Sequence, residues 1–154
     1  MPFLSSCKQQ EINPIQKKKG FTIEAKSGNW KYENGKNYLA VFTTLTNNSP
    51  ATIPYVSFSC DWEGAYATDN SNLLVFEEGC DKNFPVTLTL PPQTSEETKL
   101  IWLATTADTL KLRGTRFRIG FNYVPFTTPE NLEKDANKLF EHSNMIWSDT
   151  LTLK

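Results

Sequence analysis

The sequence has no excess of charge of either sign. Its 154 residues include 16 Lys and Arg against 17 Asp and Glu, which gives a formal net charge of −1. Attraction to nucleic acid or to anionic lipid depends on a field of one sign, and this balance does not supply one. No run of the sequence approaches the roughly 20 apolar residues that span a bilayer. We therefore expect no nucleic-acid partner and no membrane-spanning segment.

Histidine and clustered glycine are also scarce. The one histidine is His142, and the seven glycines are spread along the chain. Acyl transfer needs a nucleophile beside a base, usually histidine, and a phosphate-binding loop needs glycines leading into a helix. We expect His142 to serve the dipole or the last carbonyls of a helix. The sequence thus predicts a protein that is not an enzyme and binds no cofactor.

Carboxylates near turns are the remaining candidates for hydrolytic chemistry: Asp61, Glu63, Glu77 and Glu78. A glycosidase needs two carboxylates facing each other across a cleft, whereas acidic residues beside turns are normally solvated. We expect Glu96-Glu97, which follows a turn, to be solvated too. Residues 69–72 (Asp-Asn-Ser-Asn) have closely spaced oxygen atoms but lack the glycine and glutamate of an EF-hand loop. A polar turn without a metal is expected there.

The first residues resemble the end of a bacterial lipoprotein signal peptide. In such a lipobox a leucine three positions before a cysteine marks the cysteine that receives lipid, and Leu4-Ser5-Ser6-Cys7 has this pattern. The charged and apolar regions of a signal peptide do not precede it here. The resemblance implies lipidation of Cys7, location in the bacterial cell envelope and membrane contact only through the lipid. If Met1 is the true start, the alternative is a cytoplasmic protein.

Residues 8–19 are polar, contain Pro14 and end in three lysines. This composition is typical of a flexible tether, so we expect residues 1–19 to be a signal remnant and tether. With Cys7 lipidated, Cys60 and Cys80 remain, and two leftover cysteines usually pair in an oxidising compartment. The lipoprotein resemblance therefore implies a Cys60–Cys80 disulfide. Two buried thiols are the cytoplasmic alternative.

Apolar residues recur with a period of two along most of residues 20–154, which indicates half-buried strands. A turn is expected at residues 27–29, and Asn34-Gly35 is a hairpin signal. The segment from Thr52 to Trp62 is expected to carry Trp62 on the same face as Val56. The expected strands cover residues 21–25, 38–46, 52–62, 73–76, 86–90, 98–104, 116–123 and 145–153.

One segment departs from this period. Thr128-Pro129-Glu130 is typical of a helix start, and Leu132, Ala136, Leu139 and Phe140 form one helical stripe. We expect a short helix over about 128–142, before the last strand. The fold prediction is an all-β, antiparallel sandwich of about eight or nine strands with Greek-key connections, occupying residues 20–154 as one domain. An up-and-down barrel is the alternative.

The segment Leu45-Thr46-Asn47-Asn48-Ser49, between two expected strands, resembles the B-to-C connection of immunoglobulin-like domains of bacterial envelope proteins. That resemblance implies an immunoglobulin-like sandwich. Large aromatic side chains are favoured at binding surfaces, so Trp30, Trp62 and Tyr66, together with Glu63, are candidate binding residues. Core positions are the alternative for these aromatic residues.

These features predict a non-catalytic binding or accessory module of the cell envelope that contacts a protein or a glycan through its loops. One alternative is an inhibitor or immunity-type protein that blocks another protein's active site. A second is a hydrolase that uses a carboxylate pair.

Overall fold

The two longest strands form a hairpin at the N-terminal end of the domain. The computed structural model describes residues 20–154, so the predicted lipidation of Cys7 and the tether lie outside the described residues. β1 (Phe21–Glu33) and β2 (Lys36–Asn47) pair antiparallel. Their turn is Asn34-Gly35, with φ of 48° and 78°, the conformation that this dipeptide favours. The hairpin prediction is confirmed.

The turn predicted at residues 27–29 is wrong. β1 continues through it, and the register with β2 shifts between Ser27 and Trp30, so that two residues of β1 oppose one residue of β2. Pairing with β2 absorbs the extra residue as a bulge, which bends a strand without ending it.

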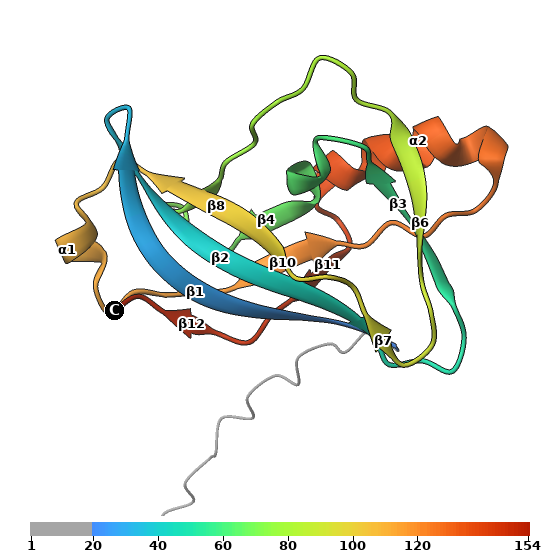
Figure 1. The fold of residues 1–154 in the computed structure, drawn as a ribbon, viewed down its shortest axis with the longest axis horizontal. Coiled ribbons are helices and arrows are strands. Elements are labelled where there is room, and N and C mark those ends of the chain that lie inside the picture. Colours follow the sequence, from blue (N-terminus) through green and yellow to red (C-terminus); the bar gives the residue numbers. More distant parts are fainter. Residues whose placement is uncertain (1–19) are drawn as a thin grey trace, which may run out of the picture.

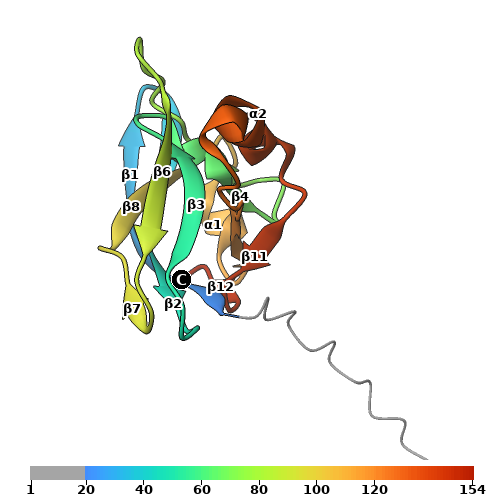
Figure 2. The same ribbon diagram turned by 90° about the vertical axis from the view of Figure 1, so that its right-hand side faces the viewer.

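The strands form two layers (Figure 2). In the first layer the order is β1-β2-β8-β5, and β7 also pairs with the end of β2. A separate pair, β3 with β6, continues beside it, and the second layer contains β11-β10-β4 and the pair β12-β9. Every one of these pairs is antiparallel. The bounds are β3 Ile53–Phe58, β4 Tyr66–Thr68, β5 Leu74–Val75, β6 Pro85–Leu90, β7 Thr94–Ser95, β8 Lys99–Thr105, β9 Arg116–Phe117, β10 Ile119–Asn122, β11 Met145–Trp147 and β12 Leu151–Thr152.

The antiparallel all-β sandwich is therefore confirmed, but the described residues contain twelve strands rather than eight or nine. Two expected strands, at residues 116–123 and 145–153, are each split between partners, and β4 and β7 form where no strand is expected. Residues 145–153 pair first with β10 and then with β9. The strand expected to reach Trp62 stops at Phe58, whose partner in β6 is Pro85. One more backbone bond follows, from the Ser59 N–H to the Phe84 carbonyl at 2.9 Å. The Phe84 N–H bonds the Ser59 hydroxyl at 3.0 Å in place of the Ser59 carbonyl, which ends the ladder, and Trp62 begins a 3₁₀ helix, η1 (Trp62–Ala65).

The helix predicted near the C-terminus is confirmed. It consists of η2 (Pro129–Asn131), α2 (Leu132–Asn137) and η3 (Lys138–Glu141), which follow one another without a break. Ala136 and Leu139 are buried in the core, whereas Phe140 is partly exposed and stacks on Phe58 at 5.2 Å between ring centroids. The helix packs against β3 and β6 (Figure 1). A second short helix, α1 (Thr109–Leu112), lies in a predicted loop and is capped by Asp108.

The predicted disulfide is present between Cys60 and Cys80, with their Cα atoms 6.2 Å apart, inside the usual range. It joins the end of β3 to the segment that leads into β6.

No helix in residues 20–154 combines the length and the apolar character needed to cross a bilayer.

One buried amide fixes the junction of the two sheets in the first layer. The Asn47 side chain is fully buried, and its Nδ2 donates to the carbonyl oxygens of Ala51 (2.8 Å), Leu90 (2.9 Å) and Pro91 (3.1 Å). Its Oδ1 accepts from the Ser49 N–H at 2.8 Å. The last residue of β2 thus holds the end of β6 and shapes the turn into β3.

Replacing Asn47 tests this role. Asn47→Ala removes a buried donor from the Leu90 carbonyl and the acceptor of the Ser49 N–H. The Ala51 and Pro91 carbonyls keep a hydroxyl donor each. We expect a loss of about 2–3 kcal/mol in the free energy of unfolding. Asn48→Ala is the matched control, because the exposed Asn48 side chain donates only to the Thr22 hydroxyl; its expected loss is under about 0.5 kcal/mol. Urea denaturation measures both. Equal losses would show that Asn47 has no special role.

Candidate functional site

The four residues predicted for binding do not form one surface. Trp30 is half-buried on β1 and lines a shallow hollow with Leu39 and Leu153. Trp62 and Glu63 belong to η1, and Trp62 meets Tyr66 edge-on at 6.0 Å between ring centroids. Only 2% of Tyr66 is exposed, so its predicted role as a surface contact is corrected to a core position. The ring is buried because β4 pairs with β10 inside the second layer.

A broad hollow lies between β6 and the chain that runs from β7 into β8; we call it the β6 groove. Its volume is about 700 Å³. Beyond the point where Asn47 holds them together, β6 and β7 diverge, since β6 pairs with β3 whereas β7 pairs with β2. The groove is lined by Tyr55, residues 87–91, residues 94–97 and Lys99.

A nearly buried carboxylate lies at the floor of the β6 groove. Only 12% of the Glu96 side chain is exposed, and its Oε2 accepts from the Lys99 Nζ at 3.1 Å and from the Tyr55 hydroxyl at 3.2 Å. The Lys99 Nζ also lies 5.2 Å from the centre of the Trp62 ring. Burial and the adjacent Glu96 charge raise the pKa of Tyr55, so this phenol remains a hydrogen-bond donor. Within the described residues, one of the two Glu96 carboxylate oxygens is therefore paired.

Three buried polar atoms lack a hydrogen-bond partner among residues 20–154, and one of them belongs to this ion pair. They are the Tyr66 hydroxyl, the Thr43 Oγ1 and the Glu96 Oε1. Burial raises the pKa of Tyr66, the Glu96 charge adds to the rise, and the Thr43 hydroxyl opposes it. Buried polar atoms of this kind are normally satisfied by water or by a ligand group. The arrangement therefore combines two hydroxyl donors with one carboxylate acceptor.

The acidic residues predicted as a carboxylate pair do gather near the disulfide. Partial burial raises the pKa of Glu63, its own backbone N–H lowers it, and Glu78, Asp61 and Glu77 raise it further. Their mutual repulsion is the property that sequence spacing could not reveal. They form an acidic surface rather than part of the β6 groove.

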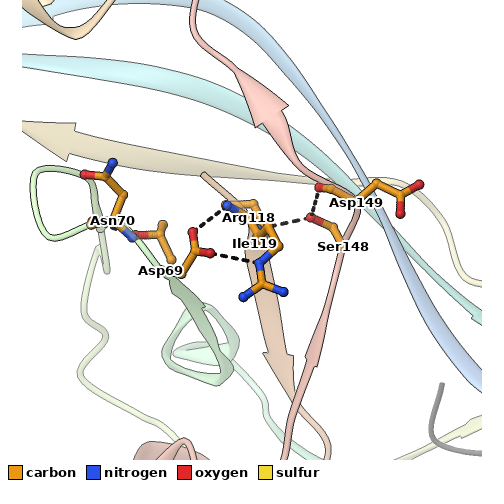
Figure 3. Close-up of polar contacts among 7 residues, drawn as sticks. Asp69, Asn70, Arg118, Ile119, Ser148 and Asp149 are labelled. Carbon is orange, nitrogen blue, oxygen red and sulfur yellow. Dashed lines mark hydrogen bonds and ion pairs between the residues drawn. The ribbon is translucent and has the colours of Figure 1, made fainter. Parts of the chain in front are cut away.

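Asp69 holds an arginine (Figure 3). Its two carboxylate oxygens accept from the Arg118 backbone N–H at 2.6 Å and from the Arg118 Nε at 2.8 Å. Asn70 Oδ1 accepts from the Asn72 N–H at 3.0 Å, which makes the predicted polar turn. On the other side of β10 the Ser148 hydroxyl accepts from the Ile119 N–H at 3.1 Å. These contacts anchor the start of β10 on both sides.

His142 ends the helical segment in a left-handed conformation, with φ of 49°. Its Nε2 lies 2.9 Å from the carbonyl oxygen of Gly64. The prediction that it serves the carbonyls of its own helix is therefore corrected: the ring connects the helix end to η1, because the chain reverses there.

Sequence reasoning missed Tyr55, Glu96 and Lys99. Glu96 was expected to be solvated because it follows a turn, but its backbone N–H pairs with the Leu45 carbonyl at 3.0 Å, which draws it over the core. One signal was present in the sequence. Lys99 precedes Ile101 and Leu103 in an inward-facing alternation, and an inward lysine requires a partner.

Two tyrosine-to-phenylalanine changes separate the roles of these hydroxyls. Tyr55→Phe removes a donor from the Glu96 carboxylate, and we expect it to lower the free energy of unfolding by about 1.5–3 kcal/mol. Tyr66→Phe removes a buried hydroxyl that has no partner among residues 20–154. Because such a group costs free energy, we expect no loss, and a gain of up to about 1–3 kcal/mol. Urea denaturation of both variants checks the contrast. A loss for Tyr66→Phe would mean that an ordered water or ligand bonds that hydroxyl.

Glu63 should make stability depend on pH. An acid whose pKa is raised in the folded state is destabilising once it is ionised, and the penalty disappears as pH falls below its ordinary value of 4.5. We expect Glu63→Gln to be more stable than the parent near pH 7, with a difference that shrinks towards about pH 4. Glu97→Gln, at an exposed carboxylate, controls for removing one negative charge. Urea denaturation at both pH values is the measurement; a stability gain that did not change with pH would contradict the assignment.

The β6 groove, with Glu96, Lys99 and Tyr55 at its floor, is thus the best-defined candidate site in residues 20–154. No protein-family model, no curated protein and no solved structure matched this chain.

Proposed function

We propose that this protein is an exported, non-catalytic binding module that holds a protein partner in the β6 groove. The proposal rests on one observation: within residues 20–154, one edge of β6 is unpaired. Among these residues the strand pairs only with β3; none of its six residues is charged, and its one proline, Pro85, is its first residue. Edge strands are usually protected by charge, proline, a bulge or a covering segment. An unpaired edge beside a groove offers backbone hydrogen-bonding groups to a protein partner.

The chemistry of the floor supports binding rather than catalysis. Lys99 balances the charge of Glu96, which also accepts a hydrogen bond from the Tyr55 hydroxyl, and the raised pKa of Tyr55 keeps that hydroxyl protonated. The groove therefore presents hydrogen-bonding groups and apolar surface instead of an activated nucleophile. Partners are held by such pre-formed sites when the supporting residues are rigid, and here α2 packs behind β3 and β6.

The Cys60–Cys80 disulfide supports export, because disulfides persist in oxidising compartments. A lipid anchor at Cys7 would then place the module on the cell envelope, with the membrane contacted only through the lipid. The predicted protein partner fits the β6 edge better than a glycan does, since an open strand edge offers backbone donors and acceptors in the spacing of another polypeptide.

Site-specific photo-crosslinking in intact cells of the native host tests this proposal. A benzophenone amino acid replaces Thr89, which is exposed on β6, or Leu110, which is exposed on α1 away from the groove. We expect light to produce a discrete protein adduct at position 89 and none at position 110, recovered with the envelope fraction and with no thiol open to alkylation. Adducts at both positions, or at neither, would contradict a specific partner in the groove.

A further inference from the structure

Resting on that proposed function, we propose that the partner enters the β6 groove as an extended peptide segment, pairs with β6 as an added strand, and places uncharged side chains on its inward positions. The argument begins with the direction in which each backbone group of β6 points. Strand edges of this kind are the template for peptide recognition by strand addition.

The bonds of β3 fix those directions. On the side away from β6, the Val56 N–H donates to the Val124 carbonyl at 2.9 Å, and the Phe126 N–H donates to the Pro54 carbonyl at 3.4 Å. Backbone groups of alternate residues point to opposite sides of a strand. The backbone groups of Tyr55 and Ser57 must therefore point towards β6.

The register carries this alternation into β6. Tyr55 is opposite Leu88 and Ser57 is opposite Val86, so the backbone groups of Leu88 and Val86 point back towards β3. The N–H and C=O groups of Thr87 and Thr89 then point away from β3, on the side where both residues line the β6 groove. No strand within residues 20–154 pairs with this side of β6. The two threonines are two residues apart, which is the spacing at which an added strand forms its hydrogen bonds.

The side chains of β6 and of the groove determine which residue types fit the added strand. Thr87 and Thr89 are exposed, whereas Leu88 and Leu90 are turned inwards. A residue of the added strand opposite Leu88 therefore points inwards, towards Tyr55 and the Glu96–Lys99 ion pair that line the same groove. The charges of that pair already balance one another. A charged side chain placed there would lose its water without gaining a partner, so inward positions should be uncharged, and outward positions next to the threonines tolerate polar or β-branched residues.

The first experiment selects linear dodecapeptides from a phage-displayed library on the full chain and measures the affinity of the synthetic winners. Thr89→Pro removes the N–H that points into the groove, without removing a bond to β3. We expect it to weaken binding about tenfold or more, the equivalent of one lost hydrogen bond. Thr89→Val, which keeps the N–H and alters only an exposed hydroxyl, is the matched control and should bind within about twofold of the parent.

A second measurement leaves the protein unchanged, in case Thr89→Pro folds poorly. Each peptide amide is methylated in turn, and we expect binding to fail at every second position, because only alternate amides of an added strand face β6. Amide hydrogen exchange at Thr87 and Thr89 should slow when the peptide binds. If selected peptides contain charged residues, we expect these at the outward positions, next to Thr87 and Thr89, and not at the inward positions opposite Leu88.

Several results would overturn strand addition: no peptide selected, equal affinity for Thr89→Pro and Thr89→Val, or methylation effects without a two-residue period. Dimerisation of the free protein through β6, detected by its solution mass and lost in Thr89→Pro, would also overturn it, because the edge would then serve a second copy. If the crosslink at position 89 still identifies a partner while these tests fail, the partner binds as a folded surface. The proposed function then stands and only the strand mode falls.

Discussion

The Asn47 amide is the contact on which the shape of this fold depends. It donates to carbonyls of the β2–β3 turn and of the last residues of β6, so strands from two different sheets are held together at one buried point. From that point β6 follows β3 while β7 and β8 follow β2. The β6 groove exists because this divergence starts at a fixed place. A buried amide with all its partners specifies a junction of this kind better than apolar contact does, since it is costly to leave unsatisfied.

The same junction accommodates a carboxylate near the core. Taking Glu96 and Lys99 out of water costs free energy that their attraction offsets only with good geometry and additional hydrogen bonds. Tyr55 supplies one of those bonds, and Trp62 lies beneath the ammonium. The pair is therefore weak support for stability. Its value is specificity: it fixes where β8 begins relative to β3 and η1, and it keeps the floor of the groove free of net charge.

The exposed edge of β6 is held in place by its neighbours. An exposed edge without charge is a risk for aggregation, but β6 is short and is backed by β3 and α2. The Cys60–Cys80 bond restrains the segment that leads into it, and Asn47 restrains its end. An edge held at both ends can accept a strand with little reorganisation, which lowers the entropic cost of binding.

The sequence by itself determined most of the elements, because their signals are local. Alternation predicted most of the strands, Asn34-Gly35 the hairpin, and Thr128-Pro129-Glu130 the helix, each from neighbours within a few positions. The short elements β4, β7 and α1 carry no such signal. The resemblance to immunoglobulin-like envelope domains and the lipid at Cys7 stay predictions. The tertiary structure alone decided the site, because burial of Glu96 and Tyr66 depends on residues far apart in the sequence that meet only when the layers pack. A glutamate after a turn can be solvated, or it can be buried when its backbone N–H bonds to another strand. The local sequence is the same in both cases.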